Sequence, residues 1–197
     1  NGGQVSTANG SSDVCQIDGA VSVVADSSLY AKQGPIHILA PISGSAKITN
    51  PGSDASACIL VFESASSTFN GNLVNSGRFE LADGAVFNFT IGAAGVNNSI
   101  SGSGASTALN GVFVIDTSGA STTTGDTWTL VSASNASYGS TFSVSGYTEV
   151  VPGVWDGTNY WFDAATGVLT RGEPPTTSGV YLNTGGDSMG YSSFDND

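Results

Sequence analysis

The sequence predicts an all-β fold, and within that class a parallel β-helix (a β-solenoid), with a β-sandwich as the alternative. Three observations carry the prediction, and the first is clearest from Ser67 to Asp116. Short β-type pieces in this stretch alternate with turns of Gly, Asn, Ser and Asp, and none is long enough for a helix with a core-facing stripe. The other two observations are the even spacing of these pieces and a polar residue that recurs where they end.

Apolar residues stand at the centres of successive strand-like pieces at short, even intervals. The centres are Ile36, Ile48, Ile59, Phe69, Phe79 and Phe87. Such spacing fits either a sandwich built from hairpins or a solenoid whose coil has two or three strands. In a solenoid with a coil spacing of about 4.8 Å, roughly seven to nine coils would make a rod about 35–45 Å long.

A recurring phrase favours the solenoid. Strand-like pieces end at Asn or Asp followed by a turn residue, as in KITNPG, NLVNSG, FELADG and VIDTSG. An Asn or Asp at each corner can bend the chain, and its side chain can bond the equivalent turn above or below. The pairs Asn70-Gly71 and Asn110-Gly111, which would mark the hairpins of a sandwich, lie inside strand-like pieces instead.

The chain divides into three regions. Residues 1–13 are polar and turn-like, and we expect an N-terminal arm that is either loose or held by a neighbouring subunit. Residues 14–171 are expected to form the β-helix domain, with apolar pieces bounded by Gly, Pro, Asn and Asp turns. Residues 172–197 open with the linker Glu173-Pro174-Pro175 and are expected to be a flexible tail or a strand donated to a neighbour.

Aromatic residues gather in 124–171, towards the end of the β-helix domain. This region holds Trp128, Trp155 and Trp161 together with Tyr147 and Tyr160. A solenoid has an open apolar end that must be covered, and large aromatic side chains cover much area per residue. We therefore expect an aromatic-rich C-terminal cap of antiparallel strands; the alternative is an aromatic platform that binds sugars.

A family resemblance agrees with this prediction. The segment TFNGNLVNSGRFELADGAVFNFTI resembles the repeats of bacterial autotransporter passengers and related exported β-helix proteins. The pieces GDTWTLV and WFDAATGVLT are similar to the segment that closes such repeat regions in large bacterial surface proteins. The resemblance covers roughly Ser67 to Arg171. It implies a right-handed parallel β-helix and roles in adhesion, display and self-association.

Composition excludes several classes of partner. Sixteen acidic and four basic side chains give a net charge of −12, so a nucleic acid or an anionic membrane surface finds few cationic contacts. No apolar run approaches the roughly 20 residues of a membrane span, so we expect no membrane insertion. Because the chain begins at Asn1, we expect that a leader was removed or that the chain was trimmed. Few lysines and many Ser, Thr and Asn residues are typical of an exported, extracellular or cell-surface protein.

The sulfur and histidine residues define few candidate sites. Cys15 and Cys58 are the only cysteines, and in an exported chain we expect them to form a disulfide; two buried free thiols are the alternative. With one His and two Cys, no zinc site is expected. His37 lies in the apolar piece PIHILA, and without a Gly-x-Ser-x-Gly elbow we expect it to be structural.

Acidic residues are the remaining candidates for chemistry. A carboxylate pair for polysaccharide cleavage would come from Glu63, Glu80, Asp83, Asp116 and Asp163. Their separations give no repeated pair on one face, so we assign no catalytic residue and no cofactor. A calcium loop at Asp156-Gly157-Thr158-Asn159 or Asp195-Asn196-Asp197 has no further support.

The sequence thus predicts a non-enzymatic extracellular structural protein, a self-assembling subunit of a surface filament or adhesive layer. The expected assembly is head to tail. A carbohydrate-binding or adhesin module that recognises surface glycans is the alternative, followed by a polysaccharide-cleaving enzyme. The residues expected at subunit or ligand contacts are Trp155, Tyr160, Trp161, Tyr181, Leu182, Tyr191 and Phe194.

Overall fold

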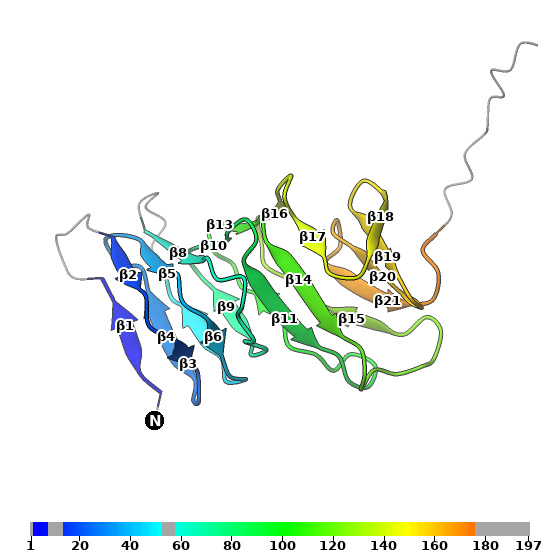
Figure 1. Cartoon of the computed structure of the whole chain (residues 1–197), viewed down its shortest axis with the longest axis horizontal. Coiled ribbons are helices and arrows are strands. Elements are labelled where there is room, and N and C mark those ends of the chain that lie inside the picture. Colours follow the sequence, from blue (N-terminus) through cyan, green and yellow to red (C-terminus); the bar gives the residue numbers. More distant parts are fainter. Residues whose placement is uncertain (1, 8–13, 53–57, 176–197) are drawn as a thin grey trace, which may run out of the picture.

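The computed structural model describes residues 2–7, 14–52 and 58–175, and in this part of the chain it is all-β (Figure 1). It contains 21 strands and no helix among the described residues. Parallel strands stack turn upon turn into a β-solenoid, and an antiparallel sheet follows at the C-terminal end. The predicted β-solenoid is therefore confirmed, and the parallel pairing rules out a sandwich of hairpins for the stacked part.

Each turn of the solenoid passes through three faces. The first face holds β1 (Gln4–Ser6), β4 (Ser27–Tyr30), β7 (Ile48–Asn50), β9 (Leu73–Asn75) and β12 (Ile100–Ser101). The second face holds β2 (Cys15–Ile17), β5 (Ile36–Ile38), β8 (Ile59–Phe62), β10 (Arg78–Leu81), β13 (Ser106–Leu109) and β16 (Ala136–Tyr138). The third face holds two sheets, β3 (Val21–Ser22) with β6 (Ile42–Ser43), and β11 (Val86–Thr90) with β14 (Val112–Asp116) and β17 (Ser143–Val144); Thr68 and Phe69 bond to the strands on either side and connect them.

The solenoid makes about five turns, fewer than the seven to nine expected. The reason is that each turn contains three strands and their corner loops. Ile36 lies beside Leu60 in the next turn of the second face, whereas Ile48, which comes between them in the sequence, belongs to the first face. The short intervals in the sequence therefore separate successive faces, and not successive turns.

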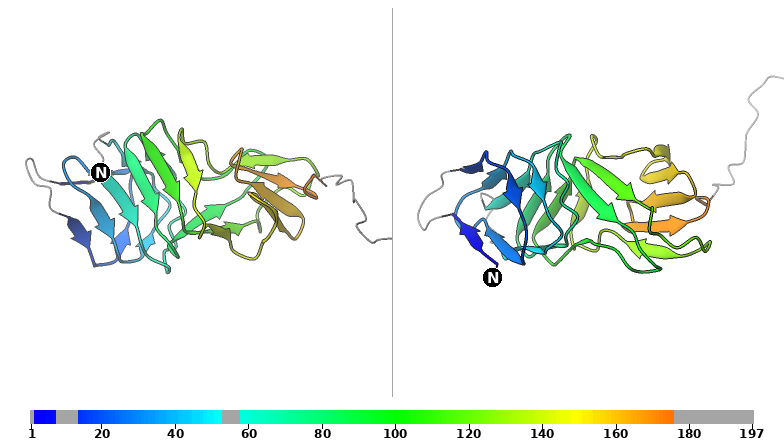
Figure 2. Two further views of the ribbon diagram at one scale, coloured as in Figure 1. Left: turned by 90° about the horizontal axis from the view of Figure 1, so that it is seen from above. Right: turned by 60° about the horizontal axis from the view of Figure 1, so that its bottom comes forward.

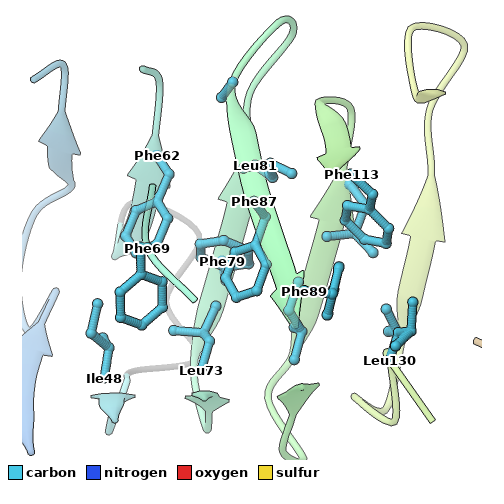
Figure 3. Close-up of a cluster of buried hydrophobic side chains, with 14 of the residues drawn as sticks. Ile48, Phe62, Phe69, Leu73, Phe79, Leu81, Phe87, Phe89, Phe113 and Leu130 are labelled. Carbon is cyan, nitrogen blue, oxygen red and sulfur yellow. The ribbon is translucent and has the colours of Figure 1, made fainter. Parts of the chain in front are cut away.

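Alternation along the short strands places apolar side chains inside the solenoid (Figure 3). In β5 and β10 the residues Ile36, Ile38, Phe79 and Leu81 are fully buried, whereas the residues between them are partly exposed. Phenylalanines continue the core from turn to turn, with Phe62 and Phe79 at 5.1 Å and Phe89 and Phe113 at 4.8 Å between ring centroids. These contacts hold neighbouring turns together.

A ladder of buried polar side chains lies at the corner between the first and second faces. Asn50 Nδ2 donates to Asn75 Oδ1 at 2.9 Å, and Asn75 Nδ2 donates to Thr107 Oγ1 at 3.0 Å. All three residues are fully buried. The bonds run along the solenoid axis, so this corner uses its asparagines in the way the recurring phrase predicts.

The antiparallel sheet covers the C-terminal end of the solenoid (Figure 2). Its strands, in spatial order, are β15 (Thr127–Thr129), β21 (Val168–Arg171), β20 (Tyr160–Asp163), β19 (Val154–Gly157) and β18 (Thr148–Val151). Trp128, Phe162 and Leu169 are fully buried and extend the solenoid core. The expected aromatic cap is therefore present. Its strands are not continuous in the chain, because β16 and β17, which belong to the last turn of the solenoid, come between β15 and β18.

The N-terminal segment departs from the expected arm. Residues 4–6 form β1, which pairs in parallel with β4 and places Val5 beside Leu29. Polar composition did not prevent this, because a first strand needs only main-chain groups to join the sheet edge. Residues 8–13 of the predicted arm lie outside the described residues, as does the tail from residue 176.

Candidate binding regions at the two ends of the solenoid

The N-terminal rung, formed by β1, β2 and β3, leaves three strand edges without a neighbour among the described residues. On the second face, Cys15 N donates to Pro35 O at 3.0 Å, and Ile17 O accepts from Leu39 N at 3.1 Å. Successive main-chain groups in a strand point to opposite sides. The N–H and C=O of Gln16, between these two residues, therefore point away from the solenoid.

The same alternation holds on the other two faces. Thr7 N donates to a β4 carbonyl at 3.3 Å, so the main-chain groups of Ser6 point to the open side. The amides of Val21 and Val23 bond toward β6 at 3.0 and 2.9 Å, so those of Ser22 point to the open side. Each face thus offers an unprotected donor and acceptor at this end.

Apolar side chains reach the N-terminal rung. A cavity of about 170 Å³ opens between β1, β3 and β4, and its apolar walls come from Val5, Val21, Val23, Leu29 and Ile48. Val5 is 41% exposed. Val5 is therefore an exposed apolar side chain at this end, whereas Val23, Leu29 and Ile48 behind it are buried.

At the C-terminal end, Tyr138 lies where the last turn meets the cap. In register, Tyr138 continues a column of inward side chains from Phe62, Leu81 and Leu109. Its ring packs against Phe142 with centroids 4.7 Å apart. Its hydroxyl is buried and has no hydrogen-bond partner within the described part of the chain.

Two cavities meet at Tyr138. The first, of about 300 Å³, lies between the last turn and residues 164–167 and is lined by Ser132, Ser134 and Thr166. The second, of about 210 Å³, is lined by Phe142, Glu149, Gly153 and Trp155. Tyr138 and Ala164 line both cavities, so the two cavities adjoin at these residues.

The expected aromatic contact residues do not form one platform. In the pairing of β19 with β20, Trp155 lies opposite Phe162 and Trp161 lies opposite Asp156. Because neighbouring pairs point to opposite faces of a sheet, Trp155 and Trp161 are on different faces. Tyr160 is 8% exposed and its hydroxyl donates to the Ser121 carbonyl at 3.1 Å, so Tyr160 is part of the core.

Four other expected contact residues, Tyr181, Leu182, Tyr191 and Phe194, lie outside the described residues. Sequence reasoning missed Tyr138 and Glu149 as candidates. An aromatic residue within the polar run SNASYGS was the available signal for Tyr138.

The predicted disulfide is absent: Cys15 and Cys58 are both free thiols. Cys15 lies beside Ile36 and Ile36 lies beside Leu60, so Cys15 is two strand spacings, about 10 Å, from β8. A disulfide requires Cα atoms within about 7 Å. Cys58 is buried, and its thiol donates to the Lys32 carbonyl at 3.2 Å.

The acidic candidates are dispersed, with one exception on the second face. Asp83 and Asp116 are exposed, and the Ser118 amide donates to the Asp116 carboxylate at 2.9 Å and lowers its pKa. Asp163 caps its own turn through Ala165 N at 2.9 Å. Asp116 and Asp163 thus stabilise turns.

Glu63 and Glu80 are the exception, because Val61, two residues before Glu63 in the chain, lies beside Glu80. Their side chains nevertheless bond in opposite directions along the solenoid: Glu63 to His37 Nδ1 of the preceding turn, and Glu80 to Asn110 Nδ2 of the following turn at 3.1 Å. Neither residue lines any of the three cavities described above. His37 is half-buried and pairs with Glu63, and is not isolated among apolar side chains.

No three His, Cys, Asp or Glu side chains within residues 2–7, 14–52 and 58–175 are grouped so that they could hold a metal ion. The suggested loop 156–159 is instead the β19–β20 hairpin, and Asn159 has a φ of 64° there. The second suggested loop, 195–197, lies outside the described residues. In the described part of the chain no helix has the length and hydropathy that a membrane crossing requires.

Alkaline pH is expected to destabilise the capped end. Burial raises the pKa of Tyr147 from 10.0 to about 12, with smaller effects from Tyr160 and Asp156, and burial also raises the pKa of Tyr138. Since the folded-state pKa is the higher one, stability is unaffected below pH 10 and falls as the pH approaches 12. We expect Tyr147 to contribute a loss on the order of 1–2 kcal/mol, allowing for its partial exposure.

Urea unfolding between about pH 8 and pH 12 measures this loss. In Tyr147→Phe the free energy of unfolding should fall less steeply with rising pH than in the parent chain. If the free energy of unfolding falls equally with pH in Tyr147→Phe and the parent chain, Tyr147 does not contribute to the alkaline loss of stability.

Comparison with known proteins identifies no relative: no protein-family model, curated protein or solved structure matches this chain.

Proposed function

We propose that this chain is a non-enzymatic structural module that associates with a second copy of itself through its N-terminal rung. The observation that carries the proposal is the contrast between the two ends: three unpaired strand edges at one end and an antiparallel cap at the other. Exposed strand edges recruit further strands unless charge, proline or a covering segment blocks them.

The N-terminal rung has little of this protection. Within 2–7 and 14–22 the only charged residue is Asp18, and there is no proline. The residues whose main-chain groups face outwards, Gln4, Ser6, Gln16 and Ser22, are neutral. A chain that carries a net charge of −12 therefore meets its copy with least repulsion at this end.

The cap favours a closed pair over a filament. Two copies that meet N-terminal rung to N-terminal rung are related by a two-fold axis, so their facing strands run antiparallel and each bond occurs twice. The cap occupies the surface that a head-to-tail contact would use. Residues 174–197 are the part of the chain left to supply such a contact, so the predicted head-to-tail filament is tested by deleting them. A closed pair ends with two copies, whereas a filament of this module would extend into an extracellular layer.

Proline substitution tests the pair. The triple variant Ser6→Pro/Gln16→Pro/Ser22→Pro removes three outward donors per chain and leaves the N–H groups that bond within the solenoid in place. We expect its association to be weaker by at least about 100-fold, measured by sedimentation equilibrium over a wide concentration range. The control Ser6→Ala/Gln16→Ala/Ser22→Ala should still pair, and thermal unfolding checks that both variants fold.

A parent chain that stays monomeric at high concentration would overturn the proposal, as would a proline variant that pairs like the parent. Long particles in electron micrographs that disappear when residues 174–197 are deleted would support the head-to-tail filament instead.

A further inference from the structure

The packing of the solenoid does not explain why residue 138 carries a hydroxyl group. Tyr138 continues an apolar column in which the preceding residues in register are Phe62, Leu81 and Leu109, so a phenylalanine would give the same packing. Its hydroxyl is buried without a partner among the described residues. Buried polar groups normally have a protein, water or ligand partner. Burial raises the Tyr138 pKa, so the hydroxyl stays protonated and can donate.

The chemistry around Tyr138 differs between its two cavities. The larger cavity is lined by the hydroxyls of Ser132, Ser134 and Thr166. The smaller cavity combines a partly exposed indole, that of Trp155, with the carboxylate of Glu149. Trp155 stands edge-on against Phe142, with centroids 5.6 Å apart and rings at 90°, which fixes the orientation of the indole.

Glu149 is also held in position. Gly153 N donates to Glu149 Oε1 at 2.8 Å, across the turn that joins β18 to β19. Glu149 lies opposite Trp155 in the strand pairing, so both side chains are on the same face of the cap. An ionised carboxylate keeps acceptor capacity on its second oxygen. The smaller cavity therefore presents a flat apolar surface next to a fixed acceptor.

The charge of the site restricts its ligand. No Lys, Arg or His lines either cavity, whereas Glu149 lines the smaller one and Asp163 is close enough to Tyr138 to raise its pKa. An anionic ligand would find no counter-charge. A ligand rich in hydroxyl groups can donate to Glu149, accept from Tyr138 and place its C–H surface against Trp155.

We propose that the two cavities at Tyr138 form a binding site for a neutral saccharide, with one sugar ring against Trp155 and the adjoining ring beside Ser132, Ser134 and Thr166. The Tyr138 hydroxyl is buried in the free chain, so binding shifts the Tyr138 ring until its hydroxyl bonds the saccharide between the two rings. Cavity volumes of about 210 and 300 Å³ are large enough for single sugar rings. The site is at the opposite end of the molecule from the N-terminal rung, so saccharide binding and pairing are tested separately.

Calorimetric titration of the full chain with cellotriose, maltotriose and the acidic trisaccharide trigalacturonate tests this site. We expect at least one neutral trisaccharide to bind and trigalacturonate not to bind. Tyr138→Phe, which keeps the ring, should weaken binding about 5- to 10-fold, and Trp155→Ala should weaken it more than about 10-fold. Trp161→Ala, on the other face of the cap, is the matched control and should stay within about two-fold of the parent.

Three results would overturn the proposal. The first is that neither neutral trisaccharide binds at millimolar concentration. The second is that binding is equal in Tyr138→Phe and the parent. The third is that trigalacturonate binds as well as the neutral probes. If Trp155→Ala does not fold, the comparison of Tyr138→Phe with Trp161→Ala decides, since Tyr138→Phe removes a single oxygen.

Discussion

Replacing Asn75 by alanine is expected to lower the free energy of unfolding by about 3–5 kcal/mol, because its side chain makes four hydrogen bonds, three of which are buried. Asn75 Oδ1 accepts from Asn50 Nδ2 at 2.9 Å and from Gly77 N at 3.1 Å. Asn75 Nδ2 donates to Ser106 O at 2.9 Å and to Thr107 Oγ1 at 3.0 Å. Alanine removes a partner from buried Gly77 N and Thr107 Oγ1, whereas Asn50 Nδ2 keeps its bond to Arg78 O at 2.9 Å.

Asn72→Ala is the matched control for Asn75→Ala. Asn72 is close by in the chain and exposed, and its Oδ1 accepts from Ser99 N at 2.9 Å. Water can replace that bond, so we expect a loss below about 1 kcal/mol. Urea unfolding followed by circular dichroism measures both changes. Equal losses in the two variants would show that the ladder is not a main source of stability.

The ladder also shows how far the recurring corner phrase could be interpreted from sequence. In KITNPG and NLVNSG the phrase contains Asn50 and Asn75, which are buried and bonded between turns. In FELADG and VIDTSG it contains Asp83 and Asp116, which are exposed. The local sequence determines that a strand ends in a turn. Whether the polar side chain points into the core depends on the corner that the turn occupies, and this is fixed by stacking against other turns.

Features that depend on register between distant turns could not be predicted. The sequence predicts a disulfide between Cys15 and Cys58. The two residues are too far apart, because Cys15 aligns with Ile36 and Ile36 aligns with Leu60. Tyr138 is inward-facing because it aligns with Leu109 of the preceding turn. Periodicity shows that strands exist and are short, but loops of different length between them hide which residues are neighbours.

The cap was partly predictable for a related reason. The aromatic cluster over 124–171 indicated that an apolar end is covered, and the structure has such a cover. The placement of individual side chains required the hairpin between β19 and β20, which puts Trp155 and Trp161 on opposite faces of the sheet. Of the expected contact residues within the cap, Trp155 alone lines a cavity described here.

Phe113→Ala is expected to have a comparable effect on stability, about 3–5 kcal/mol, because it creates a cavity where the solenoid meets the cap. Phe113 is fully buried on β14 (Figure 3). Its ring centroid is 4.8 Å from that of Phe89, 4.9 Å from Phe142, 5.8 Å from Phe162 and 6.4 Å from Tyr138. Phe162 belongs to cap strand β20, so Phe113 links the two parts directly.

Phe113→Leu distinguishes the effect of the cavity from the effect of losing an aromatic ring, since leucine refills most of the volume. We expect it to cost no more than about 1.5 kcal/mol. Near-ultraviolet circular dichroism, which reports the packing of Trp128 and Trp155 in the cap, should change in Phe113→Ala and stay close to the parent in Phe113→Leu. If Phe113→Ala unfolds in one transition at an unchanged urea midpoint, then Phe113 does not hold the cap to the solenoid.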